Sequence, residues 1–142
     1  MTVQSRKVVR EEVGAILAMR LASLAQQVYT DQPNSFDGQS PVVVVTSDGS
    51  EREGQVQRTF SGPIAPKFML DIYVFVLATT ANADDALDQM EAALAEFVAA
   101  YPSAQTWTAI GYRERSETTF VTVLDGSEYK RERIPLVLTG KG

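Results

Sequence analysis

The sequence contains neither cysteine nor histidine. Without cysteine the chain has no disulfide, no thiolate nucleophile and no cysteine-bound zinc or iron–sulfur site. Without histidine it lacks the commonest general base and the commonest transition-metal ligand. Carboxylate pairs, lysine chemistry and Mg²⁺ or Ca²⁺ sites remain open. Because few catalytic mechanisms tolerate both absences, we expect a protein that is not an enzyme and uses no cofactor.

Long hydrophobic runs are also missing. No segment approaches the roughly 20 consecutive apolar residues of a membrane span. The N-terminal stretch "MTVQSRKVVREEVG" places acids within a few residues of the start and has no apolar run of the signal-peptide kind. We therefore expect a soluble chain that is made in a cytoplasm and does not enter a membrane.

Positive charge is in deficit, with 13 Lys and Arg against 18 Asp and Glu and a net charge of −5. An acidic balance disfavours broad binding to DNA phosphates or to anionic lipid. It suits a surface past which nucleic acid slides without sticking, although such a charge more commonly serves solubility. A length of 142 residues fits one domain over 1–142.

Two stretches have the period of an amphipathic helix. From Arg6 to Tyr29 the apolar residues recur at steps of three and four, which predicts a helix that ends before the breakers of 30–38. The second helix is predicted between Asn82 as N-cap and Pro102 as terminator. Asp84 and Asp85 then fall in its first turn, where carboxylates meet the positive end of the helix dipole.

The remaining elements have the character of β-strands, predicted over 41–46, 67–79, 106–115, 118–124 and 128–138. The strand 67–79 is apolar on both faces, so we place it centrally. Pro135 cannot donate a ladder hydrogen bond, so the final strand is either an edge or carries a bulge there. The segment 47–66 is either an extended hairpin or a long mobile loop.

The predicted order is α, β, possible β, β, α, β, β, β. This order favours an α+β fold, with two amphipathic helices packed on one face of a mainly antiparallel sheet. The opposite sheet face is too apolar for open water, so we expect it to meet another subunit.

Few residues form a pattern with catalytic meaning. Asp84, Asp85 and Asp88 are the densest carboxylate cluster, and a divalent cation bridging them would support a metal-dependent hydrolase. A solvated helix start explains the same residues without a metal, and this interpretation is preferred. Trp107 and Tyr112 could stack on bases, but without surplus positive charge they are better interpreted as core or interface aromatics. We predict no catalytic and no metal site.

Residues of mixed charge on the last strands and on the segment 47–66 are the candidate contact residues. They form either cross-strand pairs on a solvated face or a surface that docks to complementary copies of the chain. The candidates for a subunit or tube interface are Arg52, Glu53, Arg58, Phe60, Arg113, Glu114, Arg115, Arg131, Glu132 and Arg133.

A series of segments along nearly the whole chain carries a resemblance to a known family. An amphipathic helix leads into "VYTDQPNSFDGQSPVVVV" and then "SDGSER"; "FMLDIYVFVL", the acidic "DDALDQMEAAL", a strand with Trp107 and "VLDGSEYKRERIPLVL" follow. In this order they resemble the tail terminator, or tail-completion, proteins of long-tailed bacteriophages. The segments 36–41 and Asp125-Gly126 match that family as structural turns.

The resemblance implies an α+β subunit of a homo-oligomeric ring, expected to be a hexamer, at the head-proximal end of the phage tail. Such a ring assembles in the host bacterial cytoplasm, stops polymerisation of the tail tube protein and offers a face to a head-completion or neck protein. DNA passes through its lumen without specific binding. The segment 47–66 would then contact the tube, and Glu114 and Glu132 would pair with Arg113 and Arg133 of the next subunit.

Two alternatives remain beside the terminator. A head–tail connector or neck subunit makes nearly the same physical demands. A small non-catalytic module that holds a ligand or peptide between helices and sheet would instead be a monomer or dimer with a defined pocket.

Overall fold

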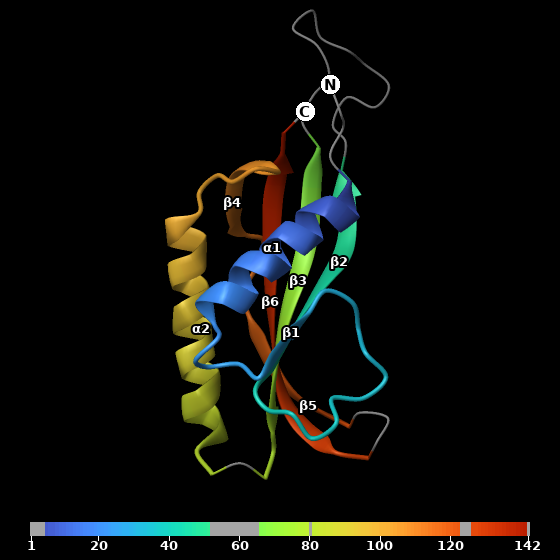
Figure 1. Cartoon of the computed structure of the whole chain (residues 1–142), viewed down its shortest axis with the longest axis vertical. Helices are drawn as coiled ribbons and strands as arrows, with labels where there is room; N and C mark the ends of the chain where they lie inside the picture. The colour runs from blue at the N-terminus through green and yellow to red at the C-terminus, as the bar shows by residue number, and fades with distance from the viewer. Residues whose placement is uncertain (1–4, 52–65, 80, 123–125, 142) are drawn as a thin grey trace, which may run out of the picture.

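The computed structural model describes residues 5–51, 66–79, 81–122 and 126–141. In these residues each of two helices is followed by three strands (Figure 1). They are α1 (Arg6–Arg20), β1 (Gln27–Tyr29), β2 (Val42–Glu51), β3 (Lys67–Leu77), α2 (Ala83–Ala100), β4 (Trp107–Tyr112), β5 (Glu117–Thr122) and β6 (Glu128–Gly140).

The six strands form one sheet in the order β1-β2-β3-β6-β4, with β5 also paired to β6. β1 runs parallel to β2, and all other pairs are antiparallel. The sheet is therefore mixed, and mainly antiparallel as predicted. β3 lies at its centre, paired to β2 along one side and to β6 along the other.

Both helices cover the same face of the sheet (Figure 1). Val9, Val13 and Leu17 of α1 and the buried side of α2 pack against alternate residues of the central strands in one core. On β3 this face consists of Phe68, Leu70, Ile72, Val74 and Val76. Because side chains alternate along a strand, the pattern over 67–77 gives a core on each side of β3. The α+β fold with two helices on one face is confirmed.

The opposite face carries a smaller core that the chain itself covers. Phe36, from the loop between β1 and β2, is fully buried there and lies edge-on to Tyr129, with ring centroids 5.2 Å apart. The centroid of the Phe75 ring lies 4.8 Å from that of Phe36. The turn that delivers Phe36 uses positive φ at Asp37 and Gly38. The part of this face around Phe36 is therefore covered by the chain itself, and no second subunit is needed to shield it from water.

The first helix is shorter than predicted. It ends at Arg20, and residues 27–29 form β1 instead of its last turn. The backbone N–H of Gln26 donates to the Pro41 carbonyl, which starts the parallel pairing with β2. Gly14 lets the returning chain approach α1, because a Cβ there would lie 2.3 Å from Thr30 Cγ2. Apolar spacing alone could not separate one long helix from a helix and a short strand.

The second helix agrees with its predicted bounds, and Asp84 and Asp85 lie in its first turn. Asn82 is the N-cap as predicted, but it adopts the left-handed conformation at φ 61° and its side chain makes no cap hydrogen bond. Asn tolerates this conformation better than most residues. Asn82 therefore starts the helix through its backbone conformation and not through a side-chain hydrogen bond.

The segment 47–66 begins as the last part of β2. β2 continues to Glu51 and pairs with β3 as far as the Glu51 and Lys67 partners, with a register shift between Ser47 and Gly49. Residues 52–65 lie outside the described part of the chain. Residues 47–51 therefore belong to β2, and the choice between hairpin and loop for the rest of the segment stays a prediction.

Pro135 does not make β6 an edge strand, so that alternative was wrong. β6 pairs with β3 on one side and with β4 and then β5 on the other. The Pro135 carbonyl accepts from the backbone N–H of Arg113, so the missing donor of Pro135 points toward the same side. The outer strand is interrupted there, at 113–116, which is how the sheet accommodates the proline.

Candidate assembly surfaces

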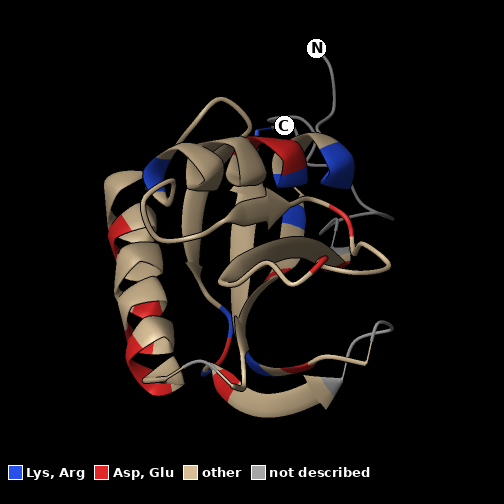
Figure 2. Ribbon diagram, turned by 60° about the horizontal axis from the view of Figure 1, so that its bottom comes forward, with Lys and Arg blue, Asp and Glu red and all other residues tan. Residues whose placement is uncertain are grey.

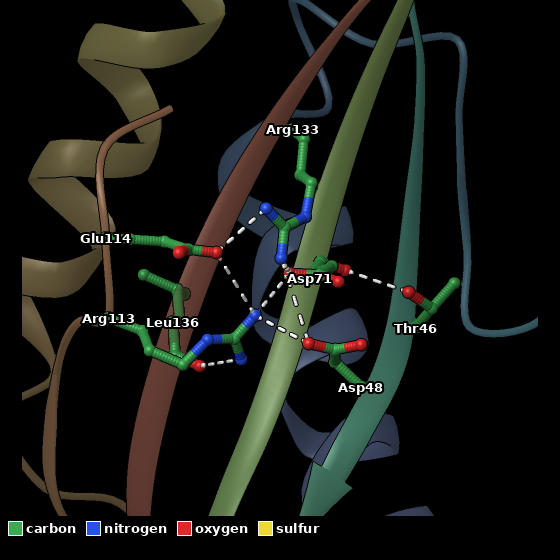
Figure 3. Close-up of polar contacts among 7 residues, drawn as sticks. All are labelled: Thr46, Asp48, Asp71, Arg113, Glu114, Arg133 and Leu136. Carbon is green, nitrogen blue, oxygen red and sulfur yellow. Dashed lines mark hydrogen bonds and ion pairs between the residues drawn. The ribbon is translucent and has the colours of Figure 1, made fainter. Parts of the chain in front are cut away.

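A network of five charged side chains lies on the sheet face opposite the helices (Figure 3). Asp71 of β3 is at its centre, with its side chain only 5% exposed. Arg113 Nη2 donates to Asp71 Oδ1 at 3.0 Å, and Arg133 Nη2 lies 3.2 Å from the same oxygen. Two guanidinium groups thus compensate one buried carboxylate, which is what burial of a charge requires.

Two more exposed acids complete this network. Arg113 also donates to Asp48 Oδ2 at 2.8 Å, and Arg133 Nη1 donates to Glu114 Oε1 at 2.9 Å. The five residues come from β2, β3 and β6 and from the segment that follows β4, so the network ties three strands and this segment together (Figure 3). It acts as a brace across the sheet.

Three of the candidate interface residues therefore have partners within their own chain. Arg113, Glu114 and Arg133 belong to the network, and Arg133 pairs with Glu114 of the same molecule. The cross-strand interpretation accounts for these three residues. Their charges are satisfied before any second subunit approaches.

The other candidates on the last strands differ from one another. The Arg131 guanidinium lies 4.7 Å from the ring centroid of Tyr73, in cation–π contact. Arg115 is exposed in the interruption between β4 and β5. The remaining four candidates, Arg52, Glu53, Arg58 and Phe60, lie outside the described residues.

Glu132 lies on the helix-facing side of β6 and is almost fully buried, at 5% exposure. Burial, followed by the nearby charge of Glu91 and a side-chain hydrogen bond with Glu91, raises the pKa of its carboxyl group from 4.5 to about 7. Asp88 adds a smaller charge effect in the same direction, and a hydrogen bond with Ser116 opposes it. Glu132 Oε2 has no hydrogen-bond partner among the described residues. Among the described residues this carboxyl group therefore has acidic neighbours and no ion-pair partner.

The acidic first half of α2 is not arranged as a metal site. Asp84 forms an ion pair with Lys130 of β6. Within the described ranges, no group of three acids has the geometry to hold a metal ion.

Four large apolar side chains are exposed in the described part of the chain, and they fall into two groups. Val8 and Met19 are 45% and 65% exposed on α1, while Tyr112 and Phe120 are 52% and 71% exposed on β4 and β5. α1 packs over β1 and β2, whereas β4 and β5 form the other edge of the sheet. The two groups therefore lie on different elements, although the end of α1 that carries Met19 lies beside α2 (Figure 1).

The two aromatic residues considered as a stacking platform, Trp107 and Tyr112, lie in different environments. Trp107 is fully buried, and its indole N–H donates to the Tyr101 carbonyl at 3.0 Å. The side chain of Tyr112 is about half exposed. Partial desolvation of its hydroxyl group, followed by the charge of Glu91, raises the pKa of that group. Trp107 is a core residue, which agrees with the preferred interpretation.

A hollow of about 450 Å³ lies beside the end of α1. Small and polar residues line it: Ala22, Ser23, Leu24, Ala25, Gln26 and Gln39. It is open and mainly polar, unlike the apolar enclosed pockets that bind small molecules.

Comparison with models of known protein families gives no match, and a search of curated proteins gives none either. Neither helix of the described residues is long and apolar enough to cross a membrane.

Sequence reasoning missed two acids of the network, Asp71 and Asp48. A lone aspartate inside the apolar run 67–77 was the available signal for Asp71, since a buried charge needs a partner. Asp48 carried no such signal, because it belongs to a polar stretch. The exposed group of Val8 and Met19 was likewise hidden within the helix pattern.

Proposed function

We propose that this chain is a structural virion protein: a tail terminator that forms a ring on the head-proximal end of a bacteriophage tail tube. The likeness of its segments to that family motivates the proposal, and the α+β fold is compatible with it. The observation that adds most is the division of the exposed apolar side chains into two unlike groups, Val8 with Met19 and Tyr112 with Phe120.

Two unlike surfaces on one chain suit a ring. A closed ring is built from heterologous contacts, in which one surface of a subunit meets a different surface of the next. Because Val8 and Met19 lie on α1 whereas Tyr112 and Phe120 lie on β4 and β5, a subunit could use a different group toward each neighbour.

The other parts of the proposal follow from the same role. The ring, proposed as a hexamer, stops growth of the tail tube protein and offers its other face to a head-completion or neck protein. Its excess of acidic over basic residues would let DNA pass through the lumen without binding. It needs no cofactor and catalyses no reaction.

Light scattering on the purified chain, over a range of concentration and salt, is the first test. A mass near six chains, or a rise toward it with concentration, together with annular particles in electron micrographs, supports the proposal. A chain that stays monomeric both alone and with preformed tail tubes contradicts it. Binding to head portals rather than tube ends would indicate the connector role.

A further inference from the structure

We infer that the outer face of α1 docks on the acidic strip between α2 and the β4–β5 edge of a second copy of this chain, with Lys7 directed at Asp88 and Glu91. The inference rests on the proposed ring and deepens it, because it names the two surfaces that meet. The acidic strip is defined by Asp84, Asp88, Glu91 and Glu132.

The acids of the strip form one line on α2. Asp84, Asp88 and Glu91 are spaced by four and three residues, so they share one side of the helix. Asp84 pairs with Lys130, and Glu91 is hydrogen-bonded to Glu132. This side of α2 therefore faces β6 and the outer strands.

The strip has more negative charge than its own chain compensates. Glu132 is 5% exposed, yet its Oε2 atom lacks a hydrogen-bond partner among the described residues. Its charged and polar neighbours are Glu91, Asp88 and Ser116, and Lys130 of the same strand is already engaged by Asp84. Asp88 and Glu91 are exposed, and neither has an ion-pair partner among the described residues. A cation supplied by another molecule would therefore lower the repulsion between the like charges of the strip.

Apolar surface lies beside the acids. Tyr112 and Phe120 are on the outer strand, at 52% and 71% exposure, and the Lys130 ammonium lies 5.7 Å from the Phe120 ring centroid. The charge of Glu91 acts on Tyr112, which places that ring next to the strip. An occupant should therefore combine positive charge with apolar side chains.

The exposed surface of α1 has both properties, with Lys7 pointing about 100° from Val8 around the helix axis. Val8 and Met19 are 11 residues apart, so they point within about 20° of each other and are separated by about 16 Å along the helix. Lys7 and Arg6 are exposed in the first turn, and neither has an ion-pair partner among the described residues. Glu11, one turn later, is the acid on this exposed face.

Opposite charge distinguishes the two helices. α2 carries five acids and no basic residue, whereas α1 carries four bases and two acids (Figure 2). In both views of the fold, the first turn of α1 lies away from α2 (Figures 1 and 2). Lys7 thus cannot reach the strip of its own chain and is placed to reach that of a neighbour.

Cross-linking tests the contact directly, because the chain has no cysteine of its own. The full-length variants Lys7→Cys and Glu91→Cys are mixed and treated with a short bismaleimide. Glu96→Cys is the matched control on α2, since five residues turn the helix by about 140° away from the strip. We expect at least about tenfold more cross-linked dimer with Glu91→Cys than with Glu96→Cys, because docking raises the local concentration. Equal yields overturn the inference.

Charge exchange gives a second readout on the same surfaces. Lys7→Glu and Glu91→Lys should each weaken the self-association constant from sedimentation velocity by about tenfold, and combining them in one chain should restore it. Glu96→Lys should leave the constant unchanged. Singles that associate like the natural chain, a double variant no tighter than the singles, or a chain that never self-associates or cross-links overturn the inference.

The proposed ring function and this subunit contact can fail independently of each other. If tail tubes are capped equally well by Lys7→Glu and by the natural chain, the function stands and this contact is wrong. If the specific cross-link forms but tubes are not capped, the contact stands and the terminator role is wrong.

Discussion

Replacing Asp71 by asparagine tests the charged network most sharply. The substitution keeps the shape of the side chain but removes its charge, leaving Arg113 and Arg133 without their shared carboxylate. Removing one partner of a fully buried ion pair costs about 3–5 kcal/mol. Both arginines are about one fifth exposed and keep other acidic partners. We therefore expect the free energy of unfolding to fall by about 2–3 kcal/mol.

Urea unfolding followed by circular dichroism measures this change, provided that the m-value is unaltered. For a domain of this size the same loss lowers the melting temperature by roughly 5–10 °C. Asp48→Asn is the matched control. That carboxylate is half exposed, so its removal should cost no more than about 1 kcal/mol. Equal effects of the two substitutions would refute the view that burial of Asp71 makes the network important.

The remaining predictions concern three other positions. Between pH 4.5 and about 7 the folded state holds a proton on Glu132 and the unfolded state does not. The free energy of unfolding should therefore fall as pH rises through this window. Glu132→Gln should flatten that slope when unfolding is measured as a function of pH. Gly14→Ala should lower the free energy of unfolding by about 1–3 kcal/mol despite the better helix propensity of alanine, because the new Cβ meets the Thr30 methyl group. Adding Thr30→Ser removes that methyl group and should recover most of the loss in melting temperature. Phe36→Ala should cost about 3–5 kcal/mol in urea unfolding, because the ring is fully buried; a loss below about 1 kcal/mol would mean that the second core is loosely packed.

The local pattern of the sequence was sufficient for the elements with strong periodicity. The strand 67–77 and the second helix were predicted because their apolar residues repeat at the spacing of one structure alone. Residues 21–29 were predicted as helix because Leu24 and Val28 pack on the core at a spacing that suits both structures. What decided against a helix there was the long-range pairing with β2.

The candidate contact residues could be predicted by type but not by partner. Sequence placed charged residues on 113–115 and 131–133, yet Asp71, which organises them, lies more than 40 residues away on another strand. Similarly, Pro135 predicted an irregularity, but the break falls on the neighbouring strand, at 113–116. Both outcomes depend on register between distant segments, which a single sequence does not encode locally.

The growth of tail tubes in the presence of the purified chain tests the central proposal most directly. Tail-tube protein of the same phage is polymerised with and without the chain, and tube length and tube ends are examined by electron microscopy. The proposal predicts that elongation stops after addition and that one end of each tube carries a ring. An unchanged length distribution, with bare ends, would contradict it.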